Sequence, residues 1–561
     1  MNGSKQFLRG GKMAFSDISY RALQDVVGEE HVTKDPVICQ AYSRVQWTPD
    51  GVIQRAQIGL SMRPACVILP SSTEEVQAIY KIANRYLFPI IPRGTGMINC
   101  AFPNREGTVV IDPKRMDRII SVDAKNMYAV IEPYVSFASL QAEAMKVGLC
   151  YPAPPAGSQI SALANISWHG GYGNSWISGL GAQMLLAYEL VLPSGEILRS
   201  GSISHTGDDW ICNDGPGPDL RGFLRGAQFG HAGGMGMVTK VSTRLFPWPG
   251  PRVFPTQGNA LEKVSEFPRD KFRWYMISFP HKYPEEEEYG LRKACDLQYE
   301  LARAEIAVVV QHLARQFLLS WASRTKQEFH EGMARNVFPH GYIFVGLCAT
   351  TSLDQLEYEE KVLHHIAEKM EGVFLTEEDE PYRLWMRIAN EWIRFGHSQR
   401  LSRPSDSFHQ GTACLDSIDA VADEILRANR AQRAVYEKEG LGKGILQPIS
   451  QHGGWINPLE KGYGAVMTTD LWPEQTPQQA AECIKLLFGS LKGMLQTKSA
   501  GASVALLGPA YDLLGPTFFN IHLIVKEMKK TFDPKNIANP PFATSPEVIP
   551  QEELAEMTRI L

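Results

Sequence analysis

Residues 90–99 read Ile90-Ile91-Pro92-Arg93-Gly94-Thr95-Gly96-Met97-Ile98-Asn99, an apolar run that breaks into a loop with two glycines and an arginine. A second strand-like run follows at Thr108 to Ile111. Because glycine reaches positive φ and lets the backbone pass close to a ligand, such a strand–loop–strand unit turns several free N–H groups towards one phosphate. An ordinary turn explains the same two glycines, so the neighbouring segments decide between these interpretations.

Length and composition indicate a globular protein of two or three packed units. The chain has 561 residues, of which 44% are apolar and 21% are charged. Its 56 basic and 61 acidic residues give a net charge of −5. Charges so nearly balanced argue against nucleic acid and against an anionic membrane surface as partners.

Cysteine usage and hydropathy exclude further classes of protein. The nine cysteines include no C-x-x-C pair, so they predict neither a zinc site nor an iron–sulfur cluster. The N-terminal residues lack a secretory pattern, and no apolar run is long enough to span a bilayer. We therefore expect a cytoplasmic protein without a direct membrane span.

The loop at residues 92–97 is preceded by a strand–helix–strand pattern. Residues 65–69 form a short apolar strand, and Ser72 to Glu75 have the S-x-x-E form of a capping box. Apolar residues then recur at helical spacing from Val76 to Tyr86, and residues 88–91 form the next strand. This unit places the loop at the carboxyl end of a strand, where ligands of α/β units bind.

A second unit leads into a long loop rich in Gly, Ser, Asn and Pro. Residues 128–132 predict a strand and residues 136–147 a helix that Gly148 terminates. About twenty-five residues without helical periodicity follow from Pro152 onward, and loops of this length inside compact domains are usually functional. The chain then forms a hairpin over residues 185–199, and a glycine turn at Gly236 begins another strand.

Five motifs in this order resemble the FAD-binding domain of the vanillyl-alcohol oxidase and p-cresol methylhydroxylase (PCMH-type) superfamily. They are Pro92-Arg93-Gly94-Thr95-Gly96, Leu163-Ala164-Asn165, Leu192-Pro193-Ser194-Gly195-Glu196, Gly236-Met237-Val238-Thr239, and Phe532 to Pro540. The resemblance implies an α+β fold, with a two-subdomain PCMH-type FAD-binding domain and an α+β substrate cap domain. We expect an N-terminal adaptor at 1–60, the FAD-binding domain at 61–250, the cap at 251–500, and a segment at 501–561 that returns to the FAD domain.

FAD needs backbone donors for its diphosphate and a flat, water-excluding slot for its ring. The amides of Arg93 to Met97 and of Ser158 to Ala162 are expected to form the diphosphate cradle. The resemblance implies further contacts along Gly171 to Ser175 and at Gly236 to Val238. The expected FAD-binding residues are Pro92, Arg93, Gly94, Thr95, Gly96, Met97, Gly157, Ser158, Ser161, Ala162, Asn165, Gly171, Tyr172, Asn174, Ser175, Gly236, Val238 and Asn536.

Relatives in this superfamily often attach their flavin covalently through histidine, cysteine or tyrosine. This chain has Met97 where attachment loops have a histidine. Cys100 and Cys150 lie near in sequence, but such cysteines are more often small buried hydrophobes. We therefore expect non-covalent FAD.

The cap departs from two family patterns. Phenol-oxidising relatives resemble one another in a tyrosine–arginine clamp and an acidic residue near the flavin. Here Pro154 to Gly157 occupy the region of the acid, and residues 498–507 contain no Tyr-Arg pair. The 2-hydroxyacid dehydrogenases hold a metal through paired histidines and a glutamate. In this chain the nearest match, residues 451–457, has a single histidine, His452. Because a catalytic metal usually needs three protein ligands, we expect no metal site.

Histidines are the candidate acid–base groups, because removal of hydride from a carbon bearing a hydroxyl requires a base for the hydroxyl proton. His452, beside two glycines and Trp455, is the first candidate. His169 in the long loop and His409 in the cap follow. A structural histidine held by hydrogen bonds is the alternative at each position.

The resemblance implies an FAD-dependent dehydrogenase or oxidase that removes hydride from a C–OH or activated C–H group of a small organic substrate. A flavin-bearing electron-transfer subunit of a larger redox complex and a 2-hydroxyacid dehydrogenase are alternatives. A flavin-dependent lyase or synthase is a further alternative. A small-molecule substrate, and either a second copy of the chain or an electron-acceptor subunit, are the expected partners.

Overall fold

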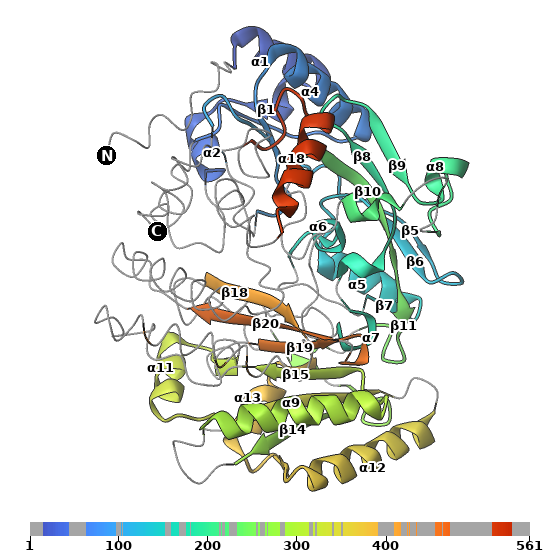
Figure 1. Cartoon of the computed structure of the whole chain (residues 1–561), viewed down its shortest axis with the longest axis vertical. Coiled ribbons are helices and arrows are strands. Elements are labelled where there is room, and N and C mark those ends of the chain that lie inside the picture. The colour runs from blue at the N-terminus through green and yellow to red at the C-terminus, as the bar shows by residue number, and fades with distance from the viewer. Residues whose placement is uncertain are drawn as a thin grey trace.

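The computed structural model describes the chain in segments, with two small sheets above a larger one in the view of Figure 1. The described residues are 15–43, 63–96, 103, 105–151, 159–167, 175–179, 181–212, 215, 219–223, 233–253, 256–258, 264–265, 267–280, 287–313, 318–319, 322–338, 341–348, 352–390, 409–416, 423, 426, 434, 455–462, 464–471 and 519–540. Only the backbone is described at some of these positions. Among the described helices, none combines the length and the apolar character that a membrane crossing requires.

The first sheet contains the predicted strand–helix–strand unit. Its strand order is β1 (Val32–Thr33), β2 (Cys66–Ile68), β4 (Val109–Ile111) and β3 (Ile90–Pro92). Strands β2 and β3 both run parallel to β4, and helix α4 (Thr73–Tyr86) connects β2 to β3. Helix α1 (Asp17–Val27) packs on α4. Parallel pairing brings the end of β3, where the glycine loop starts, to the same side as the end of β2.

Helix α4 begins with the predicted cap in a slightly different form. The Ser72 hydroxyl accepts a hydrogen bond from the Glu75 amide at 3.2 Å, as in a capping box. The Glu75 carboxylate, however, accepts from the amide of Ser71 at 2.7 Å rather than from that of Ser72. Val76 and Ile79 on this helix are fully buried, which confirms the predicted amphipathic face.

The second sheet is antiparallel throughout. Its order is β5 (Ile119–Asp123), β6 (Tyr128–Ile131), β10 (Met237–Arg244), β8 (Leu185–Val191) and β9 (Ile197–Ser200). Helix α5 (Phe137–Lys146) packs on it and ends before Gly148, whose φ is 78°. The other elements of this part are η2 (Glu29–His31), α2 (Pro36–Ala41), β7 (Leu149–Cys150), α6 (Ala162–Ser167), α7 (Ser175–Ser178), η3 (Gly181–Met184), α8 (Ile203–Thr206), η4 (Leu220–Phe223), β11 (Phe246–Pro247), β12 (Thr256–Gln257) and β13 (Val264–Ser265).

Glu189 joins the two small sheets. Its carboxylate is almost fully buried and accepts hydrogen bonds from Thr73 of α4 at 2.8 Å, Lys240 of β10 at 2.9 Å and Arg199 of β9 at 3.0 Å. Burial opposes ionisation, but the bonds from Lys240 and Thr73 outweigh it and lower the pKa of Glu189. The start of α4 is thereby attached to three strands of the neighbouring sheet.

The third sheet has seven antiparallel strands. Their order is β17 (Val373–Phe374), β14 (Phe272–Phe279), β16 (Gly341–Cys348), β15 (Val309–Leu313), β19 (Trp455–Leu459), β20 (Gly464–Leu471) and β18 (His409–Asp416). Helices α9 (Glu287–Arg303) and α12 (Leu353–Lys369) cover the side turned away from the two small sheets (Figure 1). The remaining elements are α11 (Lys326–Ala334), α13 (Glu380–Met386), η7 (Glu460–Gly462) and α18 (Ile521–Phe532).

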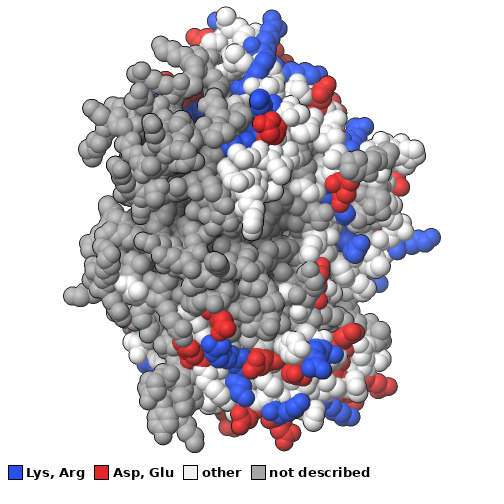
Figure 2. Space-filling view, in the orientation of Figure 1, with Lys and Arg blue, Asp and Glu red and all other residues white. Residues whose placement is uncertain are grey.

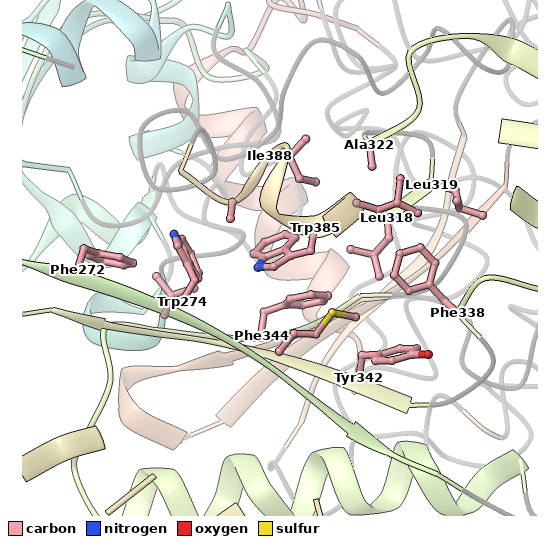
Figure 3. Close-up of a cluster of buried hydrophobic side chains, with 14 of the residues drawn as sticks. Phe272, Trp274, Leu318, Leu319, Ala322, Phe338, Tyr342, Phe344, Trp385 and Ile388 are labelled. Atoms are coloured by element: carbon pink, nitrogen blue, oxygen red, sulfur yellow. The ribbon is translucent and has the colours of Figure 1, made fainter. Parts of the chain in front are cut away.

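An aromatic cluster covers the opposite side of the seven-stranded sheet. Figure 3 shows Phe344 of the sheet beneath Trp385 of α13, and Trp274 of the sheet beside it. The ring centroids of Phe344 and Trp385 are 4.0 Å apart, and the Trp274 indole donates to Asn390 at 2.9 Å. Because the same cluster includes Trp248, which follows the second sheet, the two parts of the molecule share one core.

Trp176 of α7 provides a second connection between these parts. Its side chain is fully buried among residues of α9, α12 and the seven-stranded sheet. The indole N–H donates to the carbonyls of Ile306 and Ala307 at 3.1 and 3.0 Å. Ala307 has a φ of 71°, which is unfavourable for a residue with a side chain, so the surrounding contacts hold this turn in place.

We predict that Trp176→Phe lowers the free energy of unfolding by about 1–3 kcal/mol, because two buried carbonyls lose their shared donor while most of the ring packing is kept. Chemical denaturation measures the change. Trp248→Phe is the matched control, since its indole donates to the nearby Pro251 carbonyl at 2.9 Å. An equal loss of stability in both variants would show that the hydrogen bonds to residues 306 and 307 contribute no more than the local bond of Trp248.

Candidate cofactor site

The glycine loop leaves β3 with three consecutive amides available. The Arg93 amide donates to Ile111 at 2.8 Å and so completes the pairing of β3 with β4. The amides of Gly94, Thr95 and Gly96 have no acceptor among the described residues, although Gly96 is buried. Buried amides are rarely left without a partner. Three such donors in a row form the kind of concave surface that binds phosphate oxygens, so the loop fits a diphosphate.

The second predicted wall of the cradle contacts this loop at Ser161. The Ser161 amide donates to the Thr95 hydroxyl at 3.3 Å, and a Cβ added to Gly94 would lie 3.5 Å from the Ser161 Cβ. Gly94 therefore allows the loop to lie against Ser161. The structure brings together these two segments, which are far apart in the sequence.

The structure also narrows the predicted set of donors. The Ala162 amide donates to Val135 at 2.9 Å, and the amides of Arg93 and Ser161 have the acceptors given above. Each of these three amides is already used within the protein, so phosphate binding by them stays a prediction. The Ser161 hydroxyl donates to Pro133 at 2.6 Å and accepts from Ala164 at 3.1 Å, which places Ser161 at the start of α6.

The turn before β10 packs against the same loop. Gly236 has a φ of 119°, and an added Cβ would lie 2.0 Å from the Val191 carbonyl oxygen, so only glycine fits beside β8. A Cβ on Gly233 would lie 2.7 Å from Cγ of Pro92. Val238 is buried in the core of the second sheet. The conformation of Gly236 thus has a structural cause, and its contact with FAD stays a prediction.

A buried ion pair in the C-terminal segment holds the turn and the loop together. Lys529 and Asp533 have exposed side-chain fractions of 1% and 0%, and their charged atoms are 2.5 Å apart. The Lys529 ammonium also donates to the carbonyls of Gly234 at 2.5 Å and Ala538 at 2.6 Å. All three of its N–H donors are therefore used. Burial lowers the pKa of Lys529, and the charge of Asp533 opposes that change.

Asp533 in turn fixes the residues that follow it. Its carboxylate accepts from the amides of Ile537 at 3.0 Å and Ala538 at 2.8 Å. These residues extend the first sheet, because Ile90 donates to the Ile537 carbonyl and Asn539 donates to the Ile90 carbonyl, both at 2.8 Å. The strand that starts the glycine loop is thus flanked on its outer side by the C-terminal segment.

Helix α18 buries polar side chains rather than its isoleucines. The buried residues are His522, Lys526 and Lys529, whereas Ile521 and Ile524 are 46% and 60% exposed. Since the ion pair of Lys529 needs the interior, it determines the orientation of the helix.

Asn536 donates its amide hydrogen to the Asp533 carbonyl at 2.9 Å. The preceding residue, Lys535, donates to the Asn84 carbonyl at 3.1 Å, near the end of α4. Asn539 lies three residues further along. Its amide donates to the Ile90 carbonyl, and its Cβ would lie 4.0 Å from a Cβ added to Gly233. The structure thus favours Asn539 over Asn536 as the residue near the glycine loop.

Several predicted site residues lie outside the described residues. These are His169, His452, Met97, Gly157, Ser158, Gly171, Tyr172 and Asn174. Asn165 and Ser175 are described through their backbone only, in α6 and α7. His409, likewise described through its backbone, begins β18 and pairs with Leu471. Their roles stay predictions.

Three strands of the seven-stranded sheet, two of which carry His312 and His409, have an end on the same side of the sheet. Strands β18 and β19 both run antiparallel to β20, so they start at the same edge, and β19 starts at Trp455 shortly after His452. Strand β15 ends there, because Leu313 pairs with Trp455. His312, on that strand, is 1% exposed and its Nδ1 lies 2.8 Å from the Tyr342 carbonyl oxygen. His312 was not among the histidines predicted from the sequence. It could have been found as a histidine near the end of an apolar strand.

Charge and metal-ligand patterns give no competing site in the described part of the chain. Figure 2 shows acidic and basic side chains interspersed over the region of α9 and α12. Within the described ranges, no group of three or more His, Cys, Asp and Glu side chains is placed to hold a metal ion.

Comparison with known proteins identifies the domain and the fold. Residues 64–201 match the FAD binding domain family. Glycolate oxidase subunit GlcD of Bacillus subtilis is 30% identical over 188 residues, which are 33% of this chain and 38% of that protein. The flavoprotein subunit of 4-cresol dehydrogenase (hydroxylating) from Pseudomonas putida is 31% identical over 202 residues, 33% of this chain and 36% of that protein. The chain thus spans less than two-fifths of the length of these relatives.

The solved structure of p-cresol methylhydroxylase with substrate bound matches nearly the whole chain. It aligns with a TM-score of 0.71 and 16% identity, over 96% of this chain and 98% of that one. The predicted α+β fold is therefore confirmed as the fold of that structure, and the family match identifies FAD as the cofactor of the matched domain. Glycine loop, hairpin and C-terminal segment all belong to this fold.

We predict that Lys529→Met lowers the free energy of unfolding by about 3–5 kcal/mol, because it leaves the Asp533 carboxylate buried without a cation. The double variant K529M/D533N is expected to recover part of that loss. Lys535→Met, which removes an exposed lysine bonded to a carbonyl, should change stability by less than about 0.5 kcal/mol. Denaturant titration of the variants checks the order, and a K529M protein as stable as wild type would contradict it.

Proposed function

We propose that this chain, which carries an FAD binding domain within the fold of p-cresol methylhydroxylase, is an FAD-dependent oxidoreductase. It removes hydride from a C–OH or activated C–H group of a small organic substrate and passes the electrons to an acceptor. The observation that carries this proposal is the row of free amides at Gly94 to Gly96 inside the matched domain. A phosphate-binding loop in this position supports a dinucleotide cofactor.

The residues of the chain divide the work between the two parts of the fold. FAD supplies a ring that accepts two electrons as hydride. The amides of Gly94, Thr95 and Gly96 bind its diphosphate. The seven-stranded sheet, with the aromatic cluster around Trp274 and Trp385, acts as the substrate cap and excludes water from the reacting groups. This division corresponds to an adaptor at 1–60, an FAD domain at 61–250, a cap at 251–500 and a returning segment at 501–561.

A histidine at the shared edge of the cap sheet accepts the substrate proton. His452 is the first candidate, since it precedes β19 at the edge where β18 begins with His409. His169, in the loop that precedes α7, is the other candidate from the FAD domain. Imidazole suits the role because it titrates near neutral pH.

Two more specific forms of the proposed function are supported by the relatives. Similarity to a glycolate oxidase subunit favours a 2-hydroxy acid as the small substrate. Both of these relatives are subunits of their enzymes. This supports a partner that accepts electrons, or a larger assembly of such chains. In that case the protein is the flavin-bearing member of a redox complex.

FAD is held without a covalent bond in this proposal, because Met97 replaces the attachment histidine. Burial raises the pKa of Cys150 to about 12, which suppresses the thiolate that a cysteine linkage requires. We predict that acid or denaturant releases all yellow colour into the supernatant. Flavin that stays with the precipitated chain would contradict this prediction without touching the proposed reaction.

The reaction itself is tested by anaerobic mixing of the holoprotein with 2-hydroxy acids, primary alcohols and 4-alkylphenols. We expect at least one class to bleach the flavin absorbance. His452→Gln should keep its flavin and slow that reduction by about 100-fold, the scale of general base catalysis, whereas Gln451→Ala is the neighbouring control. Fast reoxidation by oxygen identifies an oxidase, and slow reoxidation a dehydrogenase with a partner. Failure of every class to reduce the flavin would refute the proposal.

A further inference from the structure

Arg93 begins the glycine loop, and its side chain packs against the end of that loop. Gly96 lies directly against the guanidinium, since a Cβ added there would be 2.5 Å from Nε and 2.6 Å from Nη2 of Arg93. The φ of Gly96 is 68°, a conformation that glycine adopts without strain. The loop therefore folds over its own arginine, and the position of that side chain sets the path of Gly94 to Gly96.

The N-terminal segment holds the other side of this guanidinium. Arg93 Nη1 donates to the Tyr42 carbonyl at 2.8 Å, and its Cζ lies 5.1 Å from the centroid of the Tyr42 ring. Tyr42 ends helix α2, which Asp35 caps by accepting from the amides of Val37 and Ile38. A cation over an aromatic face and a charge-assisted hydrogen bond act together here.

Tyr42 is itself anchored to the strand next to the loop. Its hydroxyl donates to Asp112, directly after β4, at 2.5 Å and accepts from Lys114 at 2.9 Å. Lys114 and Asp112 form an ion pair at 3.0 Å, and Asp112 is 4% exposed. A series of contacts thus connects the end of β4 to Tyr42, Tyr42 to Arg93, and Arg93 to Gly96.

The charged groups around Arg93 support a structural role for its side chain beside the proposed phosphate site. Burial lowers the pKa of Arg93, and Tyr42, Asp112 and Tyr134 oppose the change. Arginine keeps its proton under such conditions. Arg93, Lys114 and Asp112 leave the group with a net charge of +1 close to Gly96, which favours an anion at the free amides.

We infer that Arg93 is a positioning residue, which Tyr42 holds in place so that the Gly94–Gly96 amides face the FAD diphosphate, and that residues 35–43 thereby belong to the FAD-binding apparatus. Arg93 acts through the loop backbone and does not itself bind the phosphate. The inference deepens the proposed function at its cofactor site. It depends on FAD binding and not on the substrate or the acceptor.

The test measures the FAD dissociation constant of flavin-free protein by quenching of flavin fluorescence. Arg93→Met should weaken binding by about tenfold or more, the factor for loss of one charge-assisted contact. Tyr42→Ala keeps the backbone carbonyl but removes the ring beside the guanidinium, a cation–aromatic contact of similar size, so it should also weaken binding by about tenfold. Tyr42→Phe keeps the ring, so its affinity should stay within about threefold of wild type. If FAD is attached covalently, the fraction of chains carrying flavin replaces the affinity as the readout.

Tyr20→Ala is the matched control in the same segment. It removes another cation–aromatic pair, because Lys34 lies 4.1 Å from the Tyr20 ring centroid, but it does not touch the glycine loop. Stability of the flavin-free variants is measured beside affinity, so that partial unfolding is recognised. Weak binding by R93M with normal binding by Y42A would overturn the inference in favour of a direct phosphate contact. Equal weakening by Y20A and Y42A would overturn it in favour of general destabilisation. Lack of substrate turnover leaves these outcomes unchanged.

Discussion

The ion pair of Lys529 with Asp533 is the constraint on which the cofactor site depends. A charged pair without solvent contact is stable only when every donor and acceptor is satisfied. Here the partners that satisfy it are backbone atoms of the Gly234 turn and of the strand-like segment at 537–539. Two pieces of chain that border the glycine loop are thereby fixed by one ammonium group. The local geometry of the loop therefore depends on residues far along the sequence.

The same principle of satisfying a buried polar group at a junction recurs elsewhere in the fold. Glu189 unites the two small sheets through donors from α4, β9 and β10. Trp176 attaches α7 to the turn before β15 through one indole N–H. Apolar packing supplies most of the stability, as in any domain of this size. Polar groups with a single satisfactory arrangement determine how the packed units meet.

Sequence reasoning succeeded where a local signal was strong. The spacing of Val76 and Ile79, and the glycines at 148 and 236, predicted α4, the end of α5 and the start of β10. It failed where a distant residue decided the outcome. The buried face of α18, with Lys529 inside and Ile521 and Ile524 exposed, could not be read from the sequence, because an acceptor of Lys529 is supplied by another part of the chain. The acceptors of the Arg93 and Ala162 amides could not be read from the sequence for the same reason, since they lie on other strands or turns. The catalytic histidines remain predictions from sequence and strand direction.

The pairing of β3 with the C-terminal segment also bears on the order of assembly. Lys535 and its acceptor Asn84 are 451 positions apart, and Lys529 and Gly234 are 295 apart. Contacts of such long separation form late, because the intervening chain must be ordered first. During synthesis the glycine loop emerges first, and the segment that flanks it leaves the ribosome only after the long intervening chain. Flavin capture is therefore expected to follow synthesis of that segment, so that a chain that stops before it remains colourless.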